Sequence, residues 1–184
     1  FTRYNKLKRT YEAVTVQLQE TKELIDHLET ILTALDIARL EEDLVLIKQE
    51  LIDSGYIRGK GQTGKKGGKV MPKSKPLHYV SSDGYDMYVG KNNFQNEELT
   101  FKIATGNDWW FHAKGIPGSH VIVKSNNEEL PDTTFEEAAR LAAYYSKGKG
   151  QEKVEIDYIQ KKHVKKPAGG KPGLVIYHTN YSMM

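Results

Sequence analysis

The stretch that decides the fold runs from Asp108 to Val123 and reads Asp-Trp-Trp-Phe-His-Ala-Lys-Gly-Ile-Pro-Gly-Ser-His-Val-Ile-Val. Two runs of strand-forming residues, 109–113 and 119–123, flank a turn at 114–118 that contains Gly and Pro. This pattern predicts a β-hairpin. Because adjacent tryptophans, two histidines and a lysine are gathered in it, we also expect a functional surface here.

Strand alternation divides these side chains between two faces. One face of the first strand carries residues that we expect in the core: Trp109, Phe111 and Ala113. The other face is expected to form a polar surface, with two residues of the second strand opposite: Trp110, His112, Lys114, Ser119 and His120. A core role for Trp110 and hydrogen-bonded structural roles for the two histidines remain open alternatives. Pro117-Gly118-Ser119 fits either a small anion-binding nest or a tight turn whose glycine needs a positive φ angle.

The flanking sequence extends the hairpin into an α+β domain over residues 77–184. Strand patterns occur at 78–82 and 85–89 around Asp83-Gly84, at 154–159 and at 174–178. A helix is predicted at 135–146, with Thr133 or Thr134 as its N-cap, and residues 97–104 are an ambiguous short helix. We therefore predict a mostly antiparallel sheet with one or two helices.

Residues 1–54 carry a different pattern, in which apolar residues recur at alternating spacings of three and four. The positions are Tyr4, Leu7, Tyr11, Val14, Leu18, Thr21, Ile25, Leu28, Leu32 and Leu35. This seam predicts a long coiled-coil helix, and a second pattern at 37–51 predicts a shorter helix that ends at Ser54-Gly55. A seam of this length needs a partner helix, and the short helix is expected to cover only part of it.

Residues 55–76 separate the two parts and are rich in Gly and Lys, which predicts a flexible basic linker. The residues expected to meet a polyanion here are Arg58, Lys60, Lys65, Lys66 and Lys69. Residues 59–65 match most of a phosphate-binding P-loop. Lys66 stands where Ser or Thr would ligate magnesium, and no apolar strand precedes the segment, which favours the linker.

The charge of the chain is unevenly distributed. The net charge is +3, with 7 basic and 11 acidic residues in 1–54, 7 basic and no acidic residues in 55–76, and 13 of each in 77–184. Residues 147–171 alone hold 8 lysines against 3 acids. In a chain that is nearly neutral overall, these two basic segments indicate that 55–76 and 147–171 contact a polyanion.

The composition excludes several classes of site and protein. The chain has no cysteine, which excludes disulfides, thiolate metal sites and zinc-knuckle RNA binders and fits a reducing cytoplasm. A mean hydropathy of -0.62 indicates a soluble chain without a membrane span. The chain begins at Phe1 inside a helical pattern and stops at Met184 just after a predicted strand. We therefore expect a piece of a longer protein that lacks its last strand.

Several separated motifs together resemble one known family. They are Tyr85–Asn96, Leu99–Lys102, Asp108–Ala113, Pro117–Val121, Ala138–Lys147, Val154–Tyr158 and Lys171–Tyr177. In this order and spacing they resemble the RNA-binding domain of the NFACT family of ribosome quality-control proteins, which also carries an older fibronectin-binding label. Residues 1–54 are similar to the second, returning helix of the family's coiled-coil hairpin.

The resemblance implies an RNA- or ribosome-contacting module. Members of this family bind large ribosomal subunits obstructed by peptidyl-tRNA, and bacterial members support alanine tailing of the stalled peptide with alanyl-tRNA. The expected partners are therefore large-subunit RNA and tRNA, ribosomal proteins through the coiled coil, and a second copy of the chain. No cofactor, metal or membrane contact is expected, and the expected location is the cytoplasm.

The residues expected to contact RNA are polar, turn and aromatic residues of these motifs, with two later lysines. They are Lys91, Asn92, Asn93, Gln95, Asn96, Asp108, Trp110, His112, Lys114, Pro117, Gly118, Ser119, His120, Lys147 and Lys171. Lysines bind phosphates, and aromatic rings stack on unpaired bases.

The sequence also contains features of two other classes of function, an enzyme and a protein-interaction module. Ser119 and His120, with Asp108 or Asp157, suggest a hydrolase triad, but neighbours on a strand point to opposite faces, so no enzyme is expected. A metal site at His112 and His120 is not expected, because no third ligand lies at a spacing typical of metal sites. The main alternative is a protein-interaction module, with the coiled coil docking to ribosomal proteins or with fibronectin- or fibrinogen-binding adhesin activity.

Overall fold

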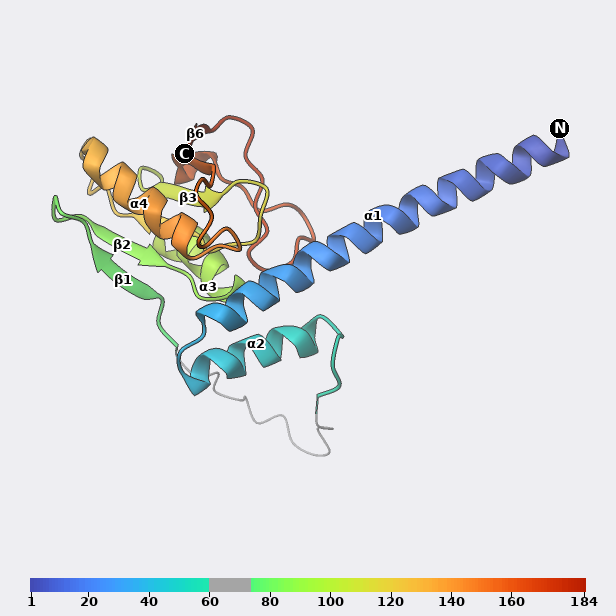
Figure 1. Cartoon of the computed structure of the whole chain (residues 1–184), viewed down its shortest axis with the longest axis horizontal. Helices are drawn as coiled ribbons and strands as arrows, with labels where there is room; N and C mark the ends of the chain where they lie inside the picture. Colours follow the sequence, from blue (N-terminus) through green and yellow to red (C-terminus); the bar gives the residue numbers. More distant parts are fainter. Residues whose placement is uncertain (60–73) are drawn as a thin grey trace.

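The computed structural model describes residues 1–59 and 74–184, in which a helical arm adjoins an α+β domain (Figure 1). The arm consists of α1 (Thr2–Ile37) and α2 (Glu41–Asp53). The domain contains β1 (Leu77–Val80), β2 (Asp86–Val89), α3 (Asn93–Glu98), η1 (Leu99–Ile103), β3 (Trp109–Ala113), β4 (Val121–Val123), α4 (Asp132–Tyr144), β5 (Ile156–Gln160), η2 (Lys161–His163) and β6 (Tyr181–Met183). This architecture confirms the predicted α+β class with a long amino-terminal helix.

The two helices of the arm form where the two hydrophobic patterns meet. Between them, the Asp43 side chain accepts hydrogen bonds from the backbone N–H groups of Arg39 and Leu40, which caps the start of α2. At the other end of α2, Gly55 adopts a φ of 75°, the left-handed conformation that terminates helices. The predicted stop at Ser54-Gly55 therefore lies where the helix ends.

The face of α1 that packs against α2 is not the predicted seam. The buried residues at this contact are Ile31 and Ala34 of α1 with Ile47 of α2, and His27 is buried on the same face of α1. The seam residue Leu32, by contrast, is 60 % exposed. The expectation that the short helix covers part of the seam is therefore wrong, because α2 packs beside the seam on the neighbouring face.

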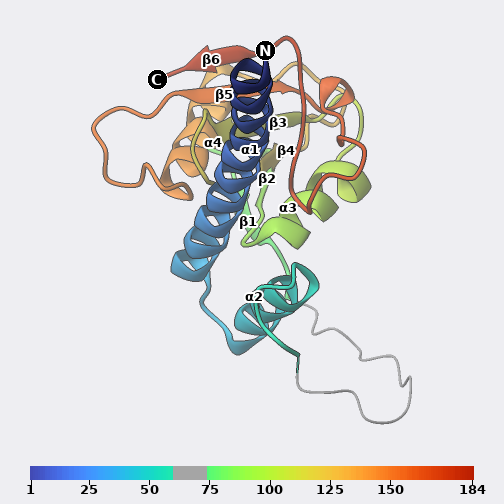
Figure 2. The same ribbon diagram turned by 90° about the vertical axis from the view of Figure 1, so that its right-hand side faces the viewer.

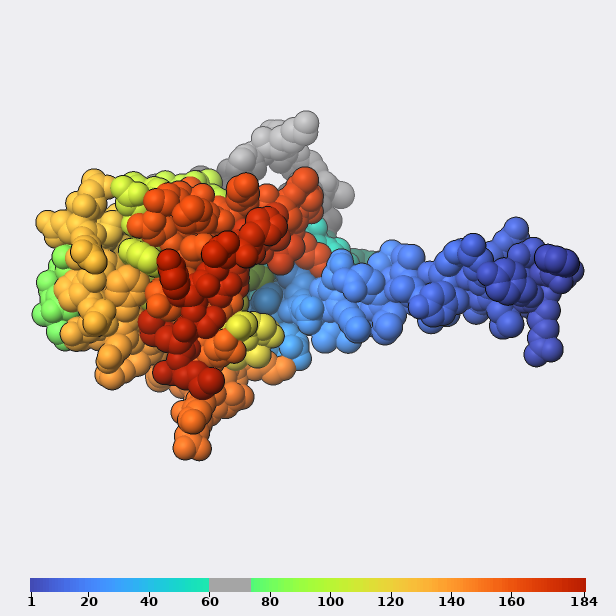
Figure 3. All heavy atoms as spheres, turned by 90° about the horizontal axis from the view of Figure 1, so that it is seen from above, coloured from blue at the N-terminus to red at the C-terminus, as the bar shows by residue number. Residues whose placement is uncertain are grey.

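The first two-thirds of α1 extends away from the rest of the structure. Every residue from 1 to 26 is exposed, and α1 projects from the domain as a single rod (Figure 3). The apolar seam is therefore open to solvent along this rod.

The strands of the described residues form one antiparallel sheet in the order β1-β2-β4-β3-β5-β6. The β1–β2 hairpin turns at the predicted position, with a φ of 87° at Gly84, but its loop is longer than the two-residue turn predicted at Asp83-Gly84, because Val80 pairs with Asp86. β3 and β4 form the predicted central hairpin, with Trp110 opposite Ile122. The predicted strand at 174–178 is wrong, since Ile176 makes only an isolated bridge to Lys165 and the edge strand is β6.

Both faces of the sheet are covered, which explains why all three residues of β4 are buried. α4 covers one face and packs on a core that includes Phe111, Val121 and Ile156. α3 lies on the opposite side of the strands from α4 (Figure 2). This other face holds a second core in which Trp110 packs with Leu99 of η1. The sheet therefore presents no broad solvent-facing surface at its centre.

The helices depart from the predicted bounds in two places. The segment at 97–104 is helical, but it begins earlier as α3 and continues as the π-helical η1, where the Ala104 N–H reaches the Leu99 carbonyl. α4 begins after Pro131 instead of at Thr133 or Thr134. The Thr134 hydroxyl is not a cap, because it donates to the Asp83 carboxylate and lies 3.0 Å from the Ser81 hydroxyl in the β1–β2 hairpin. Within the described residues, no helix is both long enough and apolar enough to cross a membrane.

Candidate nucleic-acid interface

The central hairpin has the predicted division of faces but not the predicted polar surface. Trp109, Phe111 and Ala113 belong to the core on the α4 side, while Trp110 is 0 % exposed in the second core. Trp110 packs there against the rings of His112, His120 and Tyr177. Stacking of RNA bases on Trp110 is therefore corrected to its alternative, a core role, because α3, η1 and the segment after η2 cover this face.

The two histidines of the hairpin are held as neutral rings. His120 is buried, its backbone N–H donates to Asn96, and its Nδ1 lies 2.8 Å from the Thr100 hydroxyl. Burial lowers the pKa of His112 to about 4, and burial together with the nearby His112 ring lowers the pKa of His120 well below its usual value. Neutral, packed rings fit the structural alternative for this pair. In residues 1–59 and 74–184, no group of three or more His, Cys, Asp or Glu could hold a metal ion.

The Pro117-Gly118-Ser119 turn is used for close packing. A Cβ added at Gly118 would lie 3.0 Å from the Ser146 Cβ, so glycine allows the turn to approach the end of α4. The positive φ of this turn, 65°, belongs to Gly115 instead. The Ser119 N–H donates to the Tyr145 carbonyl and the Pro117 carbonyl accepts from Lys147, so the Ser119 N–H is not available to an anion.

The remaining residues of the motif also have internal partners. Asp108 accepts hydrogen bonds from the backbone N–H groups of Thr105 and Ser125 and pairs with Lys124. These contacts join the loop before β3 to the residues that follow β4. Lys114 is exposed and pairs with Glu155 at 2.5 Å. Of the residues in this hairpin expected to contact RNA, Lys114 alone presents its charge to solvent.

The Lys91–Asn96 motif lies at the junction between the helical arm and the sheet domain. Lys91 is 4 % exposed, and its Nζ lies 2.5 Å from Oδ1 of Asp43 on α2. The Asp43 carboxylate also accepts a hydrogen bond from Ser74. Gln95 holds this arrangement, since its Oε1 accepts from the Lys91 N–H and its Nε2 donates to the Ser74 carbonyl. Burial alone would raise the pKa of Asp43, but these donors, with Lys91 first, hold it at about 2.

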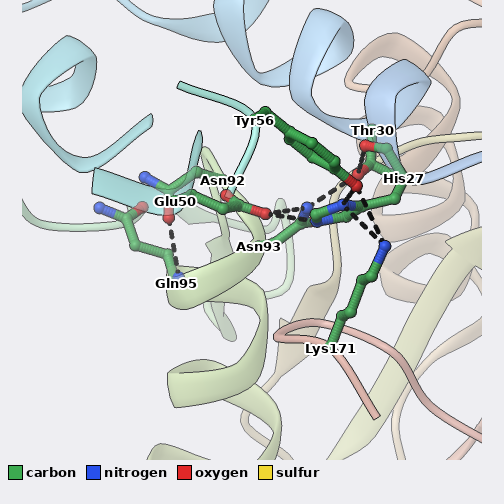
Figure 4. Close-up of polar contacts among 8 residues, drawn as sticks. All are labelled: His27, Thr30, Glu50, Tyr56, Asn92, Asn93, Gln95 and Lys171. Carbon is green, nitrogen blue, oxygen red and sulfur yellow. Dashed lines mark hydrogen bonds and ion pairs between the residues drawn. The ribbon is translucent and has the colours of Figure 1, made fainter. Parts of the chain in front are cut away.

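A second set of polar contacts completes the junction (Figure 4). Asn93 donates from Nδ2 to the Thr30 hydroxyl on α1 at 2.8 Å and to Oε1 of Glu50 on α2 at 2.7 Å. Glu50 Oε1 also lies 3.1 Å from His27 Nε2. Lys171 reaches the same group from the segment after η2, with Nζ 3.2 Å from His27 Nδ1. Four separate parts of the chain therefore converge here.

The hydrogen bonds determine which nitrogen of His27 carries the proton. Lys171 Nζ and the Tyr56 hydroxyl, the latter at 2.7 Å, both approach Nδ1, which must accept. Nε2 therefore carries the proton and donates to Glu50. Burial, with the positive charge of Lys171, lowers the pKa of His27 to about 4, and burial raises the pKa of Glu50.

Asn92 and Asn96 complete the structural use of this motif. The Asn92 side chain caps α3 by accepting from the Gln95 N–H, and Asn96 accepts from the His120 N–H. A Cβ at Gly90 would lie 2.2 Å from the Asn96 side chain, which explains the glycine there. The expected RNA contacts of Lys91, Asn92, Asn93, Gln95 and Asn96 are therefore corrected, because all five are buried. Lys91 and Asn93 contact the arm, Gln95 supports Lys91, and Asn92 and Asn96 hold α3 and β4 in place inside the sheet domain.

The partners of this motif on the arm were not predicted from the sequence. They are His27, Thr30, Asp43 and Glu50. One signal was present, since His27 lies four and seven residues before Ile31 and Ala34 and so shares their helix face. The more regular seam on the neighbouring face of α1 obscured this second contact surface.

Exposed positive charge gathers elsewhere, at the edge where η2 meets η1. Residues 161–184 contain five lysines and no acidic residue. Lys162 is joined to the loop after η1 by a hydrogen bond from its N–H to the Gly106 carbonyl, and Lys161 Nζ lies 5.9 Å from the centre of the Phe101 ring. We call Lys102, Lys161, Lys162, Lys165 and Lys166 the basic edge.

The other basic residues expected to bind RNA fall into three groups: two lysines of the sheet domain that contact the arm, one exposed arginine, and the lysines of the linker. Lys147 is exposed but pairs with Glu29 of α1 at 2.6 Å, and Lys171 contacts the junction. Arg58 is exposed at the end of the described arm. Lys60, Lys65, Lys66 and Lys69 lie outside the described residues.

A helical arm docked on an antiparallel sheet, with a lysine-rich edge, defines the class, an α+β module with an attached arm and a basic surface. Family models match both parts: the NFACT protein RNA binding domain matches residues 75–178, and the NFACT N-terminal and middle domains match residues 1–69. The chain belongs to the NFACT family.

Individual relatives agree with this assignment. The chain is 46 % identical over 178 residues to the Rqc2 homolog RqcH of Streptococcus pneumoniae, covering 96 % of this chain and 31 % of that protein. It is 40 % identical over 184 residues to the Rqc2 homolog RqcH of Bacillus subtilis, covering 100 % of this chain and 31 % of that protein. The chain thus spans about a third of the length of these relatives.

A solved structure shares the fold. The C-terminal of the fibronectin/fibrinogen-binding protein from Streptococcus suis matches with a TM-score of 0.85 and 41 % identity, covering 100 % of this chain and 71 % of that chain. The arm and the sheet domain are both included in this match.

Proposed function

We propose that this chain is an RNA- and ribosome-contacting part of a ribosome quality-control protein. On this proposal it binds large ribosomal subunits obstructed by peptidyl-tRNA, and in the whole protein it supports tRNA-dependent alanine tailing in the cytoplasm. The observation that carries the proposal is the acid-free stretch 161–184 with its five lysines, which lies largely within the matched RNA-binding domain. Lysines without acidic neighbours attract phosphates.

The chain itself is proposed to have no catalytic activity. The Ser119 hydroxyl has no hydrogen-bond partner among the described residues, and the His120 ring is engaged by Thr100. A serine nucleophile needs a base within hydrogen-bonding distance, so this arrangement supports binding instead of hydrolysis.

The test is co-sedimentation of the 184-residue chain with large ribosomal subunits. Subunits that carry peptidyl-tRNA are compared with empty subunits, and each mixture is titrated with salt. We expect co-sedimentation that weakens steeply as salt rises, because phosphate contacts release counterions. Absence of the chain from the ribosome pellet at low salt would refute the proposal.

A second candidate is an adhesin-like protein-interaction module, which is favoured by the structural similarity to the C-terminal of the fibronectin/fibrinogen-binding protein from Streptococcus suis. Binding of the same chain to immobilised fibronectin or fibrinogen tests it. Saturable binding that persists at high salt, together with no ribosome binding, would favour this candidate.

A further inference from the structure

Most lysines of the basic edge have no counter-charge in the described parts of the chain. Among the described residues, Lys102, Lys161, Lys162 and Lys165 have no carboxylate within the 4.0 Å that defines an ion pair. Lys166 is the exception and pairs with Glu97 at 2.7 Å. Lysines that pair with no carboxylate are free to bind another anion.

The segment that carries these lysines is fixed to the domain. Val164 is buried in the second core with Leu99 and Ala104, so the chain between η2 and residue 166 lies against η1. The Lys161 N–H donates to the Asp108 carbonyl at 2.8 Å. A fixed backbone holds the lysines in a constant relation to one another and lowers the entropy lost on binding.

An exposed aliphatic side chain lies beside one of these lysines. Lys165 and Ile176 are directly opposed in an isolated antiparallel bridge, and their backbones exchange hydrogen bonds of 2.9 Å. Directly opposed residues project their side chains to the same side. Both side chains are exposed, whereas the neighbouring Val175 and Tyr177 pack on the second core. A cation next to an apolar side chain suits a phosphate with its attached ribose.

We infer that the basic edge binds the phosphate backbone of RNA. The central hairpin motif does not contact the RNA and only holds the basic edge in position through the buried core. This inference rests on the proposed function and names the surface that performs it. Trp110 and Val164 belong to the same buried cluster, so the motif acts through the position of the segment that follows η2. Because lysines read charge and not base edges, the contact is independent of sequence.

The experiment measures binding of short fluorescein-labelled RNAs of two unrelated sequences by fluorescence anisotropy across a salt series. The test variant is Lys102→Gln, Lys162→Gln and Lys165→Gln together, all three positions being exposed. The control is Lys6→Gln, Lys22→Gln and Lys48→Gln on the arm, which removes the same charge from exposed lysines. A third variant carries Arg at the three edge positions and preserves the charge.

We expect the edge variant to weaken binding of both RNAs at least about tenfold and to lower the slope of log K against log salt by about 2 to 3. The arm control and the arginine variant should bind within about threefold of the unaltered chain. Equal weakening by the edge and arm variants, or no weakening by the edge variant, would overturn the inference while RNA binding itself stood. Failure of the unaltered chain to bind either RNA would instead overturn the proposed function, and the inference with it.

Discussion

At the residue scale, the two adjacent tryptophans have different roles. Trp109 is partly buried and contacts Phe135, Tyr158 and Tyr181 on the α4 side of the sheet. Trp110 is fully buried between the sheet and η1. Removal of a fully buried ring leaves a cavity that its neighbours fill only in part.

We therefore expect Trp110→Ala to lower the free energy of unfolding by about 3–5 kcal/mol, and Trp109→Ala to lower it by less. Lys114→Gln is the control, because loss of an exposed ion pair costs at most about 1 kcal/mol. Urea denaturation followed by circular dichroism measures all three. Equal losses for the two tryptophan variants would contradict the division of faces.

The buried histidines make stability depend on pH. The pKa values of His27 and His112 are lowered to about 4 and that of His120 is lowered further, so in the folded state these rings stay neutral where the unfolded chain binds protons. Their contribution to stability is therefore complete above about pH 6.5 and is lost as the pH falls toward about 4. Glu50, whose pKa is raised, acts in the opposite sense and offsets part of this loss.

Lowering the pH from about 7.5 to about 5 should reduce the free energy of unfolding by about 2 kcal/mol for each of His27 and His112. His27→Gln should remove about one such increment from the pH dependence. Urea midpoints at the two pH values provide the measurement. A pH dependence that is unchanged by His27→Gln would show that folding does not lower the pKa of His27.

The same residues mark what the sequence could predict. Alternation along 109–113 assigned each side chain to the correct face, because strand geometry fixes the faces locally. It could not tell whether the second face was exposed, since its cover comes from residues 93–103 and 164–177. For the same reason, the sequence could not show that polar residues such as Asn92 and Gln95 are buried. The arm that covers them is distant in the sequence.

At the element scale, α2 is held to the sheet domain by buried polar contacts more than by apolar packing. Asp43 of α2 meets Lys91, and Glu50 of α2 meets Asn93, on either side of the start of α3. A buried carboxylate that loses its cation remains uncompensated and is costly. The docking of α2 therefore depends on a few side chains.

Lys91→Met should destabilise the protein by about 3–5 kcal/mol, and Asp43→Asn added to it should recover part of that loss. Amide hydrogen exchange should show α2 losing protection before β3 and β4. Lys147→Met provides the comparison, since it removes an exposed partner of Glu29 and should cost at most about 1 kcal/mol. Unchanged protection of α2 in Lys91→Met would mean that the pair of Lys91 with Asp43 is not needed to hold it.

At the scale of the whole molecule, the seam of α1 is a long apolar stripe that no other described residue covers along residues 1–26. Leu18 is 54 % exposed and Ile25 is 50 % exposed. A regular apolar stripe on a lone helix favours pairing with another helix. The periodicity predicted the seam, but the choice of the neighbouring face for α2 depends on the junction with α3, which no local pattern contains.

We propose that the chain self-associates through this seam. Sedimentation velocity over a range of concentrations should show a rise in mean mass that Leu18→Asp with Ile25→Asp abolishes. Lys8→Asp with Lys22→Asp, which changes exposed polar positions of the same helix, serves as the control. A constant monomer mass at all concentrations would refute self-association by this chain.

The length of α1 gives the junction a mechanical consequence. The helix runs from His27 to Thr2 without lateral support, a span of roughly 37 Å at 1.5 Å per residue. A rotation of about 5° at the polar junction would therefore displace the tip by roughly 3 Å, about the width of a side-chain contact. Small changes in the contacts of Asp43 or Glu50 would thus produce larger displacements at the amino-terminal end of α1. Displacements of this size are enough to form or break a contact with a partner there.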